Sequence, residues 1–515
     1  MSRYDYDIII VGLGASGAAS AWMLSKSNLK ILIIEQGDEY NPDDYHKKKY
    51  FWEISKLKKF NVNPNVRDGK YDYKIDNKLS DINIANFNGI GGSTMLYSGH
   101  FPRFHPSDFK VKNVENISFN WPINYNELEP YYEINDKIIG VHGLEDDPAY
   151  PKIKNLRPPI NLGKSGELIS KAFKKLNWHC WPSYSAINVN DNFSVKTVCN
   201  TYLPIIKKSK NITIKKKLEV VKILSNEKRA KGVLCHDQQK NVLRFKSQIV
   251  ILACNGVGTP RLLLNSKNKY FQNGLANNSS CLVGKNLMLH PLGFVEGTFN
   301  KHLNSDYGPE GCCVYSHQFY EPNIKNNYKR GYTMQVLRGS GPLETSLYLK
   351  KMNKIQLGKN FFRDFFENYN KTIPIAIISE DLPKLSNYIS LNEEVKDSFG
   401  MPCVKINYKI DNNTKKILKA GIKSAKKVLE VAGAKKIFSF APVKHAGWHL
   451  MGTTKMGDHK KNSVVNRYGQ CHDLKNLVIV DSSIFTTGGA VNPISTIQAL
   501  ALKISERILE KKNEY

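Results

Sequence analysis

The sequence predicts an α/β fold, α+β overall, with one domain built on a parallel sheet and a second on an antiparallel sheet. Three observations support this prediction. A short apolar run near the N-terminus, Asp5–Val11, leads into a glycine-rich turn, and a second apolar run, 249–253, also ends in a turn of small residues. From about residue 294 to residue 443, short alternating runs are broken by Gly, Pro and Asn, a pattern typical of antiparallel strands.

The N-terminal turn has the spacing of a dinucleotide-binding motif. Gly12, Gly14 and Gly17 follow the first apolar run, and a second run, Leu29–Ile34, ends on Glu35. We expect a Rossmann-like strand, turn, helix and strand. Gly12 allows the sharp turn, Gly14 lets the backbone approach a pyrophosphate, and Gly17 lets the helix lie close to the sheet. The helix N-terminus directs free N–H groups at the phosphates, and Glu35 accepts hydrogen bonds from a ribose. A purely structural turn is the alternative.

The next segment, 36–79, is polar, aromatic and basic. We expect a surface excursion with one short helix near residues 50–58, and a lid or membrane-contact segment is the alternative. A second glycine turn follows at Gly91–Thr94 (GGST). Its amides could meet a planar ring or a phosphate closely, although a surface loop has the same composition.

The middle of the chain contains further strand and helix patterns. Residues 161–176 are expected to be helical, 212–223 an alternating strand, and 261–265 a helix after the turn at 254–260, which returns the chain to the nucleotide-binding sheet. The second domain is expected to combine an amphipathic helix, Asn413–Val431, with antiparallel strands. The alternating runs in this domain are 331–337, 373–378, 387–391 and 403–408.

The C-terminal part holds polar residues next to regular elements. A strand, Leu477–Val480, ends on Asp481, and Asn492-Pro493 opens a long helix, Ile494–Leu509. Proline is tolerated at the first helical position because its missing N–H costs nothing there. The start of this helix directs free amides and a positive dipole end at whatever lies in front of it.

The composition is that of a globular protein with a basic surface. The 515 residues are 41% hydrophobic and carry 75 Lys and Arg against 46 Asp and Glu, a net charge of +29, and this length allows a large core and two domains. The basic residues are scattered without a nucleic-acid-binding signature, so we expect surface lysines and no nucleic-acid partner. An anionic membrane or an acidic partner is the alternative.

The nine cysteines contain no C-x-x-C pair, which favours reduced thiols, a cytoplasmic location and no metal site. No apolar run approaches the ~20 residues of a membrane-spanning helix, so we expect no transmembrane segment. Because only Met1–Tyr4 precede the first apolar run, we expect no secretory signal.

Taken in order, these motifs resemble the glucose–methanol–choline (GMC) family of flavin oxidoreductases over nearly the whole chain. The matching motifs are Gly12-x-Gly14-x-x-Gly17 with Glu35, Gly91-Gly92-Ser93-Thr94, the 249–260 strand and turn, Val283-Gly284-Lys285-Asn286, His449-x-x-Gly452-Thr453-x-x-Met456-Gly457, and Asn492-Pro493. The last two are the most specific to the family.

The resemblance implies bound FAD and a discontinuous FAD-binding domain of residues 1–120, 190–295 and 444–515. It implies a substrate-binding domain of residues 296–443, with parts of 121–189. The cofactor-binding residues that it implies are Gly12, Gly14, Ser16, Gly17, Glu35, Gly91, Gly92, Ser93, Thr94, Val221, Asp481, Asn492, Pro493 and Ile494.

The resemblance also implies oxidation of an alcohol carbon, with His449 and Asn492 as the catalytic pair. Hydride passes from the carbon to flavin N5, and histidine, with an unperturbed pKa near ~6.5, is suited to accept the hydroxyl proton near neutral pH. Asn492 can donate an N–H to the substrate oxygen without competing for its proton. A buried structural histidine is the alternative for His449, and His445 is then the candidate base.

Departures from the family pattern refine these expectations. Some members tether FAD through a histidine at the position of Leu96, so we expect non-covalent FAD here, and Tyr97 replaces an asparagine near the flavin. Some sugar dehydrogenases of the family bind an iron–sulfur cluster, for which Cys180 and Cys199 alone are too few. The segment 380–402 resembles the sugar and polyol dehydrogenase and pyranose oxidase-like branch.

We therefore expect an FAD-dependent enzyme that oxidises a sugar, polyol or glycoside, with a dehydrogenase favoured over an oxidase. The electron acceptor is oxygen, a quinone or a carrier protein. Alternatives are a choline-like, aliphatic or aryl alcohol as substrate, or a lyase that retains the flavin without net oxidation. A nucleic-acid or membrane-surface binder with a vestigial flavin site is disfavoured, because His449 and Asn492 are both intact.

Overall fold

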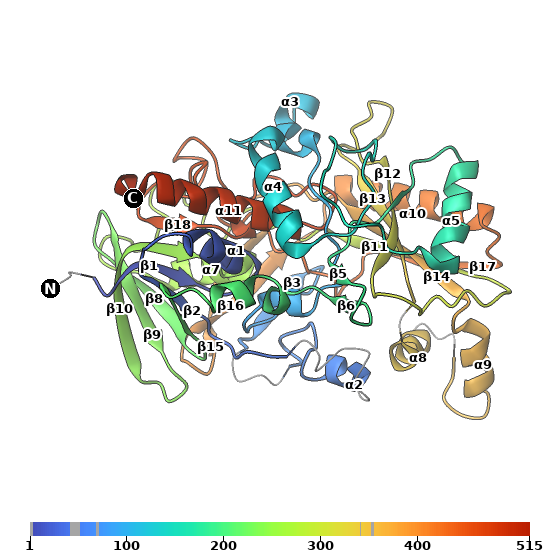
Figure 1. The fold of residues 1–515 in the computed structure, drawn as a ribbon, viewed down its shortest axis with the longest axis horizontal. Coiled ribbons are helices and arrows are strands. Elements are labelled where there is room, and N and C mark those ends of the chain that lie inside the picture. The colour runs from blue at the N-terminus through green and yellow to red at the C-terminus, as the bar shows by residue number, and fades with distance from the viewer. Residues whose placement is uncertain (1–3, 42–51, 68–71, 340, 352–354) are drawn as a thin grey trace.

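A parallel sheet and an antiparallel sheet occupy opposite halves of the molecule, as the sequence predicts (Figure 1). The structure, a computed structural model, describes residues 4–41, 52–67, 72–339, 341–351 and 355–515.

The parallel sheet is built from strands that lie far apart in the sequence. Its strands, in spatial order, are β7 (Ile212–Lys215), β2 (Ile31–Ile34), β1 (Tyr6–Val11), β10 (Val242–Leu252) and β18 (Leu477–Ile479). These runs are almost continuously apolar because helices cover both faces of such a sheet. The N-terminal half of β10 continues into an antiparallel extension with β9 (Ala230–His236) and β8 (Glu219–Ser225).

The helices of this half come from both ends of the chain. Helix α1 (Ala15–Leu24) packs against α11 (Ile494–Glu510), and Ser505 Oγ donates a hydrogen bond to Ser20 Oγ at 2.8 Å. Helix α4 (Tyr125–Ile139) lies against α11 (Figure 1). Helix α7 (Asn255–Asn265) follows β10 directly, so the expected second strand–turn–helix unit is confirmed and its helix begins six residues before 261.

The second half is a six-stranded sheet covered on one face by helices α10 (Asn412–Val431) and α5 (Gly163–Lys175) (Figure 1). Its strands, in spatial order, are β17 (Lys436–Phe440), β11 (Leu292–Thr298), β14 (Thr372–Ser379), β13 (Tyr332–Leu337), β12 (Cys312–Phe319) and β4 (Trp181–Pro182). Val295, Ile375, Ile377 and Val336 form a buried core with residues of α10 such as Ile417. The alternate side chains of the same strands therefore point away from α10.

Two expectations about strands were wrong. The runs now seen as β15 (Tyr388–Lys396) and β16 (Pro402–Tyr408) do not join the six-stranded sheet, but pair with β3 (Ile75–Ser80) in a separate sheet. The predicted strand 212–223 is two strands, because the chain turns at Lys217, which has a φ of +58°. Alternation identifies a strand but does not select its partner.

The remaining elements are short connections. Helix α2 (Trp52–Leu57) confirms the helix expected near 50–58, although residues 50 and 51 lie outside the described residues. The other helices and strands are α3 (Val111–Glu115), β5 (Ile187–Asn188), β6 (Ser194–Val195), α6 (Tyr202–Ile206), α8 (Pro342–Lys351) and α9 (Phe361–Asn368).

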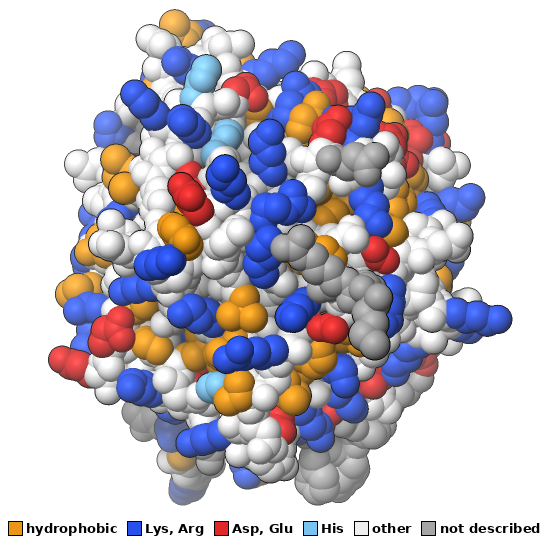
Figure 2. Space-filling model, turned by 90° about the vertical axis from the view of Figure 1, so that its left-hand side faces the viewer, with side chains coloured by type: hydrophobic (Ala, Val, Ile, Leu, Met, Phe, Trp, Pro, Cys, Tyr) orange, Lys and Arg blue, Asp and Glu red, His pale blue; other side chains and the backbone are white. Residues whose placement is uncertain are grey.

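Lysine and arginine side chains are spread over the face in Figure 2, among acidic, apolar and neutral polar groups, and are not gathered in one stripe. Within the part of the chain that the structure describes, no helix is both long enough and apolar enough to cross a bilayer.

Candidate active site

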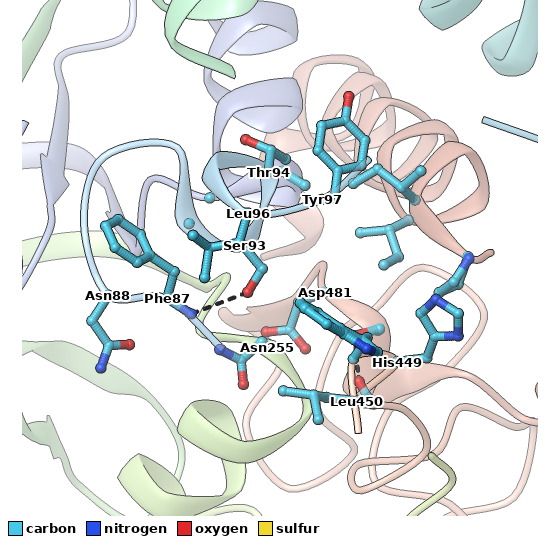
Figure 3. A pocket seen from close by; sticks show the side chains of 18 of the residues that line it. Phe87, Asn88, Ser93, Thr94, Leu96, Tyr97, Asn255, His449, Leu450 and Asp481 are labelled. Atoms are coloured by element: carbon cyan, nitrogen blue, oxygen red, sulfur yellow. Dashed lines mark hydrogen bonds between the residues drawn. The ribbon is translucent and has the colours of Figure 1, made fainter. Parts of the chain in front are cut away.

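A cavity of about 460 Å³ runs from the N-terminus of α1 to the uncovered face of the six-stranded sheet. Segments that are widely separated in the sequence line it, including the first glycine turn, the Gly92–Thr94 turn, and the regions around His449 and Asn492. The two motifs from opposite ends of the chain therefore meet at one site. In the view of Figure 3, the labelled residues of the 87–97 segment lie on one side of the cavity, and Asn255, His449, Leu450 and Asp481 lie on the other.

The first glycine turn has the geometry that a pyrophosphate needs. Gly12 adopts a left-handed φ of +97°, and Gly14 is the N-cap of α1 without a side-chain cap, so the first amides of the helix keep their donors. Gly12, Gly14 and Ser16 line the cavity. Gly17 lies behind them, where a Cβ would clash with the Gly12 carbonyl oxygen, so its role is the close packing of helix on sheet.

Glu35 lies at the end of β2, where it lines the cavity. Its carboxylate accepts hydrogen bonds from the amides of Leu13 at 2.9 Å and Gly37 at 3.0 Å. Burial raises the pKa of Glu35, and the amides of Gly37 and Leu13 oppose that shift. These two hydrogen bonds hold the Glu35 carboxylate beside the first glycine turn, where the sequence analysis expects it to bind a ribose.

On strand β8 the structure places a neighbour of the predicted residue at the cavity. Val220 lines the cavity, as do Leu218 and Glu219. The Val221 side chain instead packs with Phe399 and Met401. Val221 is not among the residues that line the cavity, although Met401, against which it packs, is, and its role toward the cofactor stays a prediction.

The second glycine turn lies directly against the first. A Cβ on Gly92 would lie only 2.9 Å from the Gly14 Cα, so the close approach of the two turns requires glycine at position 92. Gly92, Ser93 and Thr94 line the cavity, whereas Gly91, with a φ of +97°, packs behind them against Met95 and Cys199. Ser93 Oγ accepts a hydrogen bond from the Phe87 amide at 3.3 Å (Figure 3).

Residues Leu96 and Tyr97 follow this turn and also line the cavity. The Tyr97 hydroxyl donates to the Lys196 carbonyl oxygen, and burial raises the pKa of Tyr97 above its ordinary value. Its hydroxyl is therefore bound to the protein backbone.

The C-terminal motif closes the cavity from the other side. Asp481 follows β18 and accepts hydrogen bonds from Thr259 Oγ1 at 2.5 Å and the Ser483 amide at 2.9 Å, and burial raises its pKa. Pro493 is the N-cap of α11 and not its first helical residue, and the helix begins at Ile494, where the predicted range begins. Asn492, Pro493 and Ile494 all line the cavity, and the N-terminus of α11 has no side-chain cap.

The predicted catalytic pair is brought together at the sheet end of the cavity. Asn492 Nδ2 lies 3.4 Å from His449 Nε2. Gln335 Nε2 donates to Asn492 Oδ1 at 2.7 Å, which turns the Asn492 amide nitrogen toward the imidazole. Burial lowers the pKa of His449 well below its ordinary value, and the nearby His290 and His100 lower it further. His449 is therefore uncharged at neutral pH.

Three residues of this site were not predicted. His290 Nδ1 lies 2.9 Å from His449 Nδ1, and His100 Nε2 accepts a hydrogen bond from the Cys312 amide at 2.8 Å. Burial lowers the pKa of both histidines to about 4. His290 lies four residues after the Val283-Gly284-Lys285-Asn286 motif, and His100 lies six residues after the second glycine turn, Gly91–Thr94. Both histidines are therefore close in sequence to motifs that could be identified from the sequence alone. Gln335 lies in an ordinary alternating strand and carries no such signal.

His445, the alternative base, is exposed, and its Nδ1 lies 3.2 Å from Asn83 Nδ2. It is not among the residues that line the cavity. Among the described residues, no group of three or more His, Cys, Asp or Glu side chains is arranged to hold a metal ion.

The fold and the site define a flavoenzyme of the Rossmann-like α/β type, and comparisons with known proteins identify its family. Family models described as GMC oxidoreductase match residues 6–292 and residues 383–501. The chain belongs to the GMC oxidoreductase family, whose members bind FAD. It is an enzyme that acts on alcohol groups.

Relatives align along nearly the whole chain. A 2-methyl-1,2-propanediol dehydrogenase from Mycolicibacterium austroafricanum is 33% identical, covering 98% of this chain and 95% of the relative. The fructose dehydrogenase large subunit of Gluconobacter japonicus is 23% identical, covering 98% and 97%.

Solved structures share the fold. Pyridoxine 4-oxidase from Mesorbium loti has a TM-score of 0.68 at 16% identity, covering 98% of this chain and 99% of that one. Formate oxidase from Aspergillus oryzae RIB40 has a TM-score of 0.68 at 17% identity, covering 99% of both chains.

Proposed function

We propose that this protein oxidises a primary or secondary alcohol to the corresponding carbonyl compound, with His449 as general base and Asn492 as the residue that orients the substrate oxygen. The observation that supports this most directly is the pairing of His449 Nε2 with Asn492 Nδ2 across 3.4 Å at the end of the cavity. The relative named for 2-methyl-1,2-propanediol supports a small alcohol as substrate.

The chain's own residues hold the substrate hydroxyl and its proton. Asn492 Nδ2 donates to the substrate oxygen, and His449 Nε2 accepts the hydroxyl proton. Because the pKa of His449 is low, the imidazole is neutral and ready to accept that proton over a wide pH range. General-base assistance of this kind is worth roughly 10²–10⁴-fold in rate.

The cavity residues fit FAD. The uncapped N-terminus of α1, next to Gly12 and Gly14, suits the pyrophosphate, and Glu35 suits the ribose. The uncapped N-terminus of α11 suits the pyrimidine edge of the ring, since a helix dipole favours negative charge there. FAD supplies the hydride acceptor, N5. We propose that FAD is non-covalent, because Leu96 offers no nucleophile.

We keep the domain division as a proposal, with residues 1–120, 190–295 and 444–515 in the FAD-binding domain and residues 296–443 in the substrate-binding domain. We also propose a dehydrogenase rather than an oxidase, with a quinone or carrier protein as acceptor in preference to oxygen. Neither proposal affects the assignment of the catalytic pair.

The test is an anaerobic screen in which the purified yellow protein is mixed with alcohols and sugars and the absorbance of oxidised flavin is followed. We expect bleaching by at least one alcohol, followed by slow recovery when air is admitted. A lyase would act on its substrate while the flavin stays oxidised. Recovery within the turnover time would instead identify an oxidase.

The matched variants are His449→Ala and His445→Ala. We expect His449→Ala to remain yellow and to lose reduction by every substrate found, by at least roughly 10²-fold. His445→Ala should behave as the unchanged protein, because that histidine is exposed and does not line the cavity. Normal turnover by His449→Ala would refute the assignment of the base.

A further inference from the structure

One wall of the cavity is a flat face of the six-stranded sheet. Strands β11, β14 and β13 contribute its side chains in register, because Phe294 pairs with Ala376 and Ala376 pairs with Gln335. The next row pairs Leu292 with Ile378. The side chains of this wall that line the cavity are Leu292, Phe294, Gln335, Leu337, Ala376 and Ile378.

This wall is fixed by the core behind it. The alternate residues of the same strands, Val295, Val336, Ile375 and Ile377, are buried under α10. A strand cannot shift by one residue without exposing that core, so the apolar face must remain turned to the cavity. Five of the six wall residues are hydrocarbon side chains, and the exception is Gln335.

The Gln335 amide is already engaged by protein groups. Its Nε2 is bound to Asn492 Oδ1 at 2.7 Å, and hydrogen bonding to Asn492 and Gln335 raises the pKa of His100 against the larger effect of burial. The amide thus faces His100 on one side and Asn492 on the other. The Gln335 side chain therefore orients Asn492 and is not placed to bind a substrate hydroxyl.

The polar groups that flank the wall are also bound to protein. The Tyr97 hydroxyl donates to the Lys196 carbonyl. Arg338 donates to the carbonyl oxygens of Cys312 at 3.2 Å and Asn161 at 2.7 Å. Other polar side chains, such as Ser98, Glu310 and Glu344, also line the cavity, but His449 Nε2 and Asn492 Nδ2 are the pair that lies together beside Gln335 of the wall.

From this arrangement we infer that the substrate is an alcohol with one hydroxyl-bearing end and an apolar body, such as a short linear or branched aliphatic alcohol, and not a sugar or a fully hydroxylated polyol. The inference rests on the proposed function and narrows its substrate class. The reacting C–O–H group lies against His449 and Asn492, and the hydrocarbon remainder covers Phe294, Ala376 and Ile378.

The reaction itself is unchanged by this inference. The alcohol loses a hydride from carbon to the flavin and a proton from oxygen to His449, and becomes an aldehyde or ketone. A hydroxyl placed against the hydrocarbon wall loses its hydrogen bonds to water and gains none from protein. An apolar pocket rejects such an added hydroxyl by about 10²-fold.

The experiment compares alcohols of equal carbon number on the FAD-loaded protein. 1-Butanol and 2-methyl-1-propanol are compared with erythritol, and 1-hexanol with sorbitol, by anaerobic flavin reduction. We expect the reduction rate per unit concentration to favour each aliphatic alcohol by at least about 100-fold. Equal rates, or faster reduction by erythritol or sorbitol, would overturn the inference and leave the proposed function intact. Failure of every alcohol and sugar would refute the proposed function.

A binding measurement separates the substrate class from turnover. 2-Methyl-2-butanol has no hydrogen on its carbinol carbon and cannot be oxidised there. We expect it to perturb the flavin absorbance spectrum at concentrations at which erythritol does not. This spectral response depends on binding alone, so we expect it even if His449 is not the general base. A spectral change at lower concentrations of erythritol than of 2-methyl-2-butanol would contradict the inference that the wall favours an apolar substrate.

The matched variants are Ala376→Ser and Ala420→Ser. Ala376 lies between Phe294 and Gln335, so a serine there supplies a hydrogen-bonding partner on the wall. We expect the preference for 1-butanol over erythritol to fall by about tenfold. Ala420 lies on α10 and packs against the core of the second half, so the same change there should leave the preference unchanged. An unaltered preference in Ala376→Ser would count against the inference.

Discussion

His290 and His449 face one another through their Nδ1 atoms, 2.9 Å apart. Two neutral imidazoles share one proton in such a contact, so one nitrogen donates and the other accepts. If His449 Nε2 is to receive the substrate proton, then its hydrogen lies on Nδ1 and is donated to His290. His290 then carries its own hydrogen on Nε2, and the backbone groups of Gly488 and Gly489 favour protonation of that ring. The contact with His290 is therefore compatible with the tautomer in which His449 Nε2 accepts a proton from the cavity.

We predict that His290→Leu lowers kcat and moves the acid limb of the pH profile upward. Neutral His449 is the active form, so activity is lost as pH falls through its pKa. The neighbouring His290 helps to hold that pKa low, and its removal raises the pKa. The limb should therefore appear at higher pH, closer to the ordinary histidine value of ~6.5. The measurement is kcat/KM against pH.

His302→Asn is the control for this variant, because His302 is exposed. A reduced kcat with an unmoved acid limb in His290→Leu would show that His290 contributes packing alone.

We predict that Gln335→Leu reduces kcat by about 10- to 100-fold with a smaller change in KM. Without the bond from Gln335 Nε2, the Asn492 amide is free to turn its oxygen toward His449. Leaving Asn492 Oδ1 without its hydrogen-bond donor costs about 1–3 kcal/mol in the free energy of the correct orientation. The check is a double-mutant cycle with Asn492→Ala, in which the two losses should be far from additive. Additive losses would mean that Gln335 acts independently of Asn492.

Two glycine substitutions should separate cofactor binding from folding. Gly14→Ala places a Cβ 3.6 Å from the nearest atom, so the apoprotein should keep its free energy of unfolding while its affinity for FAD falls by at least tenfold. Gly17→Ala places a Cβ against the Gly12 carbonyl, so it should destabilise the apoprotein itself by about 1–3 kcal/mol. Urea unfolding and FAD titration give the two quantities. The reverse pattern would contradict the assigned roles of these glycines.

Acid precipitation should release all of the flavin into the supernatant. Leu96 occupies the position at which some relatives carry a tethering histidine, and a leucine side chain forms no bond to the ring. The measurement is the flavin absorbance of supernatant and pellet after denaturation in trichloroacetic acid. A yellow pellet would show that another residue forms a covalent bond to the flavin.

Local spacing accounts for most of what the sequence could predict. The spacing of Gly12, Gly14 and Gly17 predicts β1, the turn and α1 because all three lie within one local unit. The close contacts of Gly12 with Ala253 and of Gly14 with Gly92 come from distant parts of the chain. His449 and Asn492 could be identified because each stands in a family motif. No local sequence pattern predicts that His449 Nε2 and Asn492 Nδ2 lie 3.4 Å apart.

The unpredicted parts depend on long-range pairing. Gln335 reaches Asn492 because β13 lies third from the edge of the six-stranded sheet, and His290 reaches His449 because its segment runs beside residue 451. The sheet formed by β3, β15 and β16 joins segments separated by more than 300 residues, as the pairing of Ile75 with Val404 shows. Alternating hydrophobicity reports that a strand is half buried but does not name its neighbour.

The packing of α1 against α11 has a consequence for biosynthesis. Strand β1 and helix α1 are translated well before β18, Asn492 and helix α11, which packs against α1. A nascent chain therefore has no complete flavin site until translation nears residue 510. Chains that terminate before α11 should therefore stay colourless after purification.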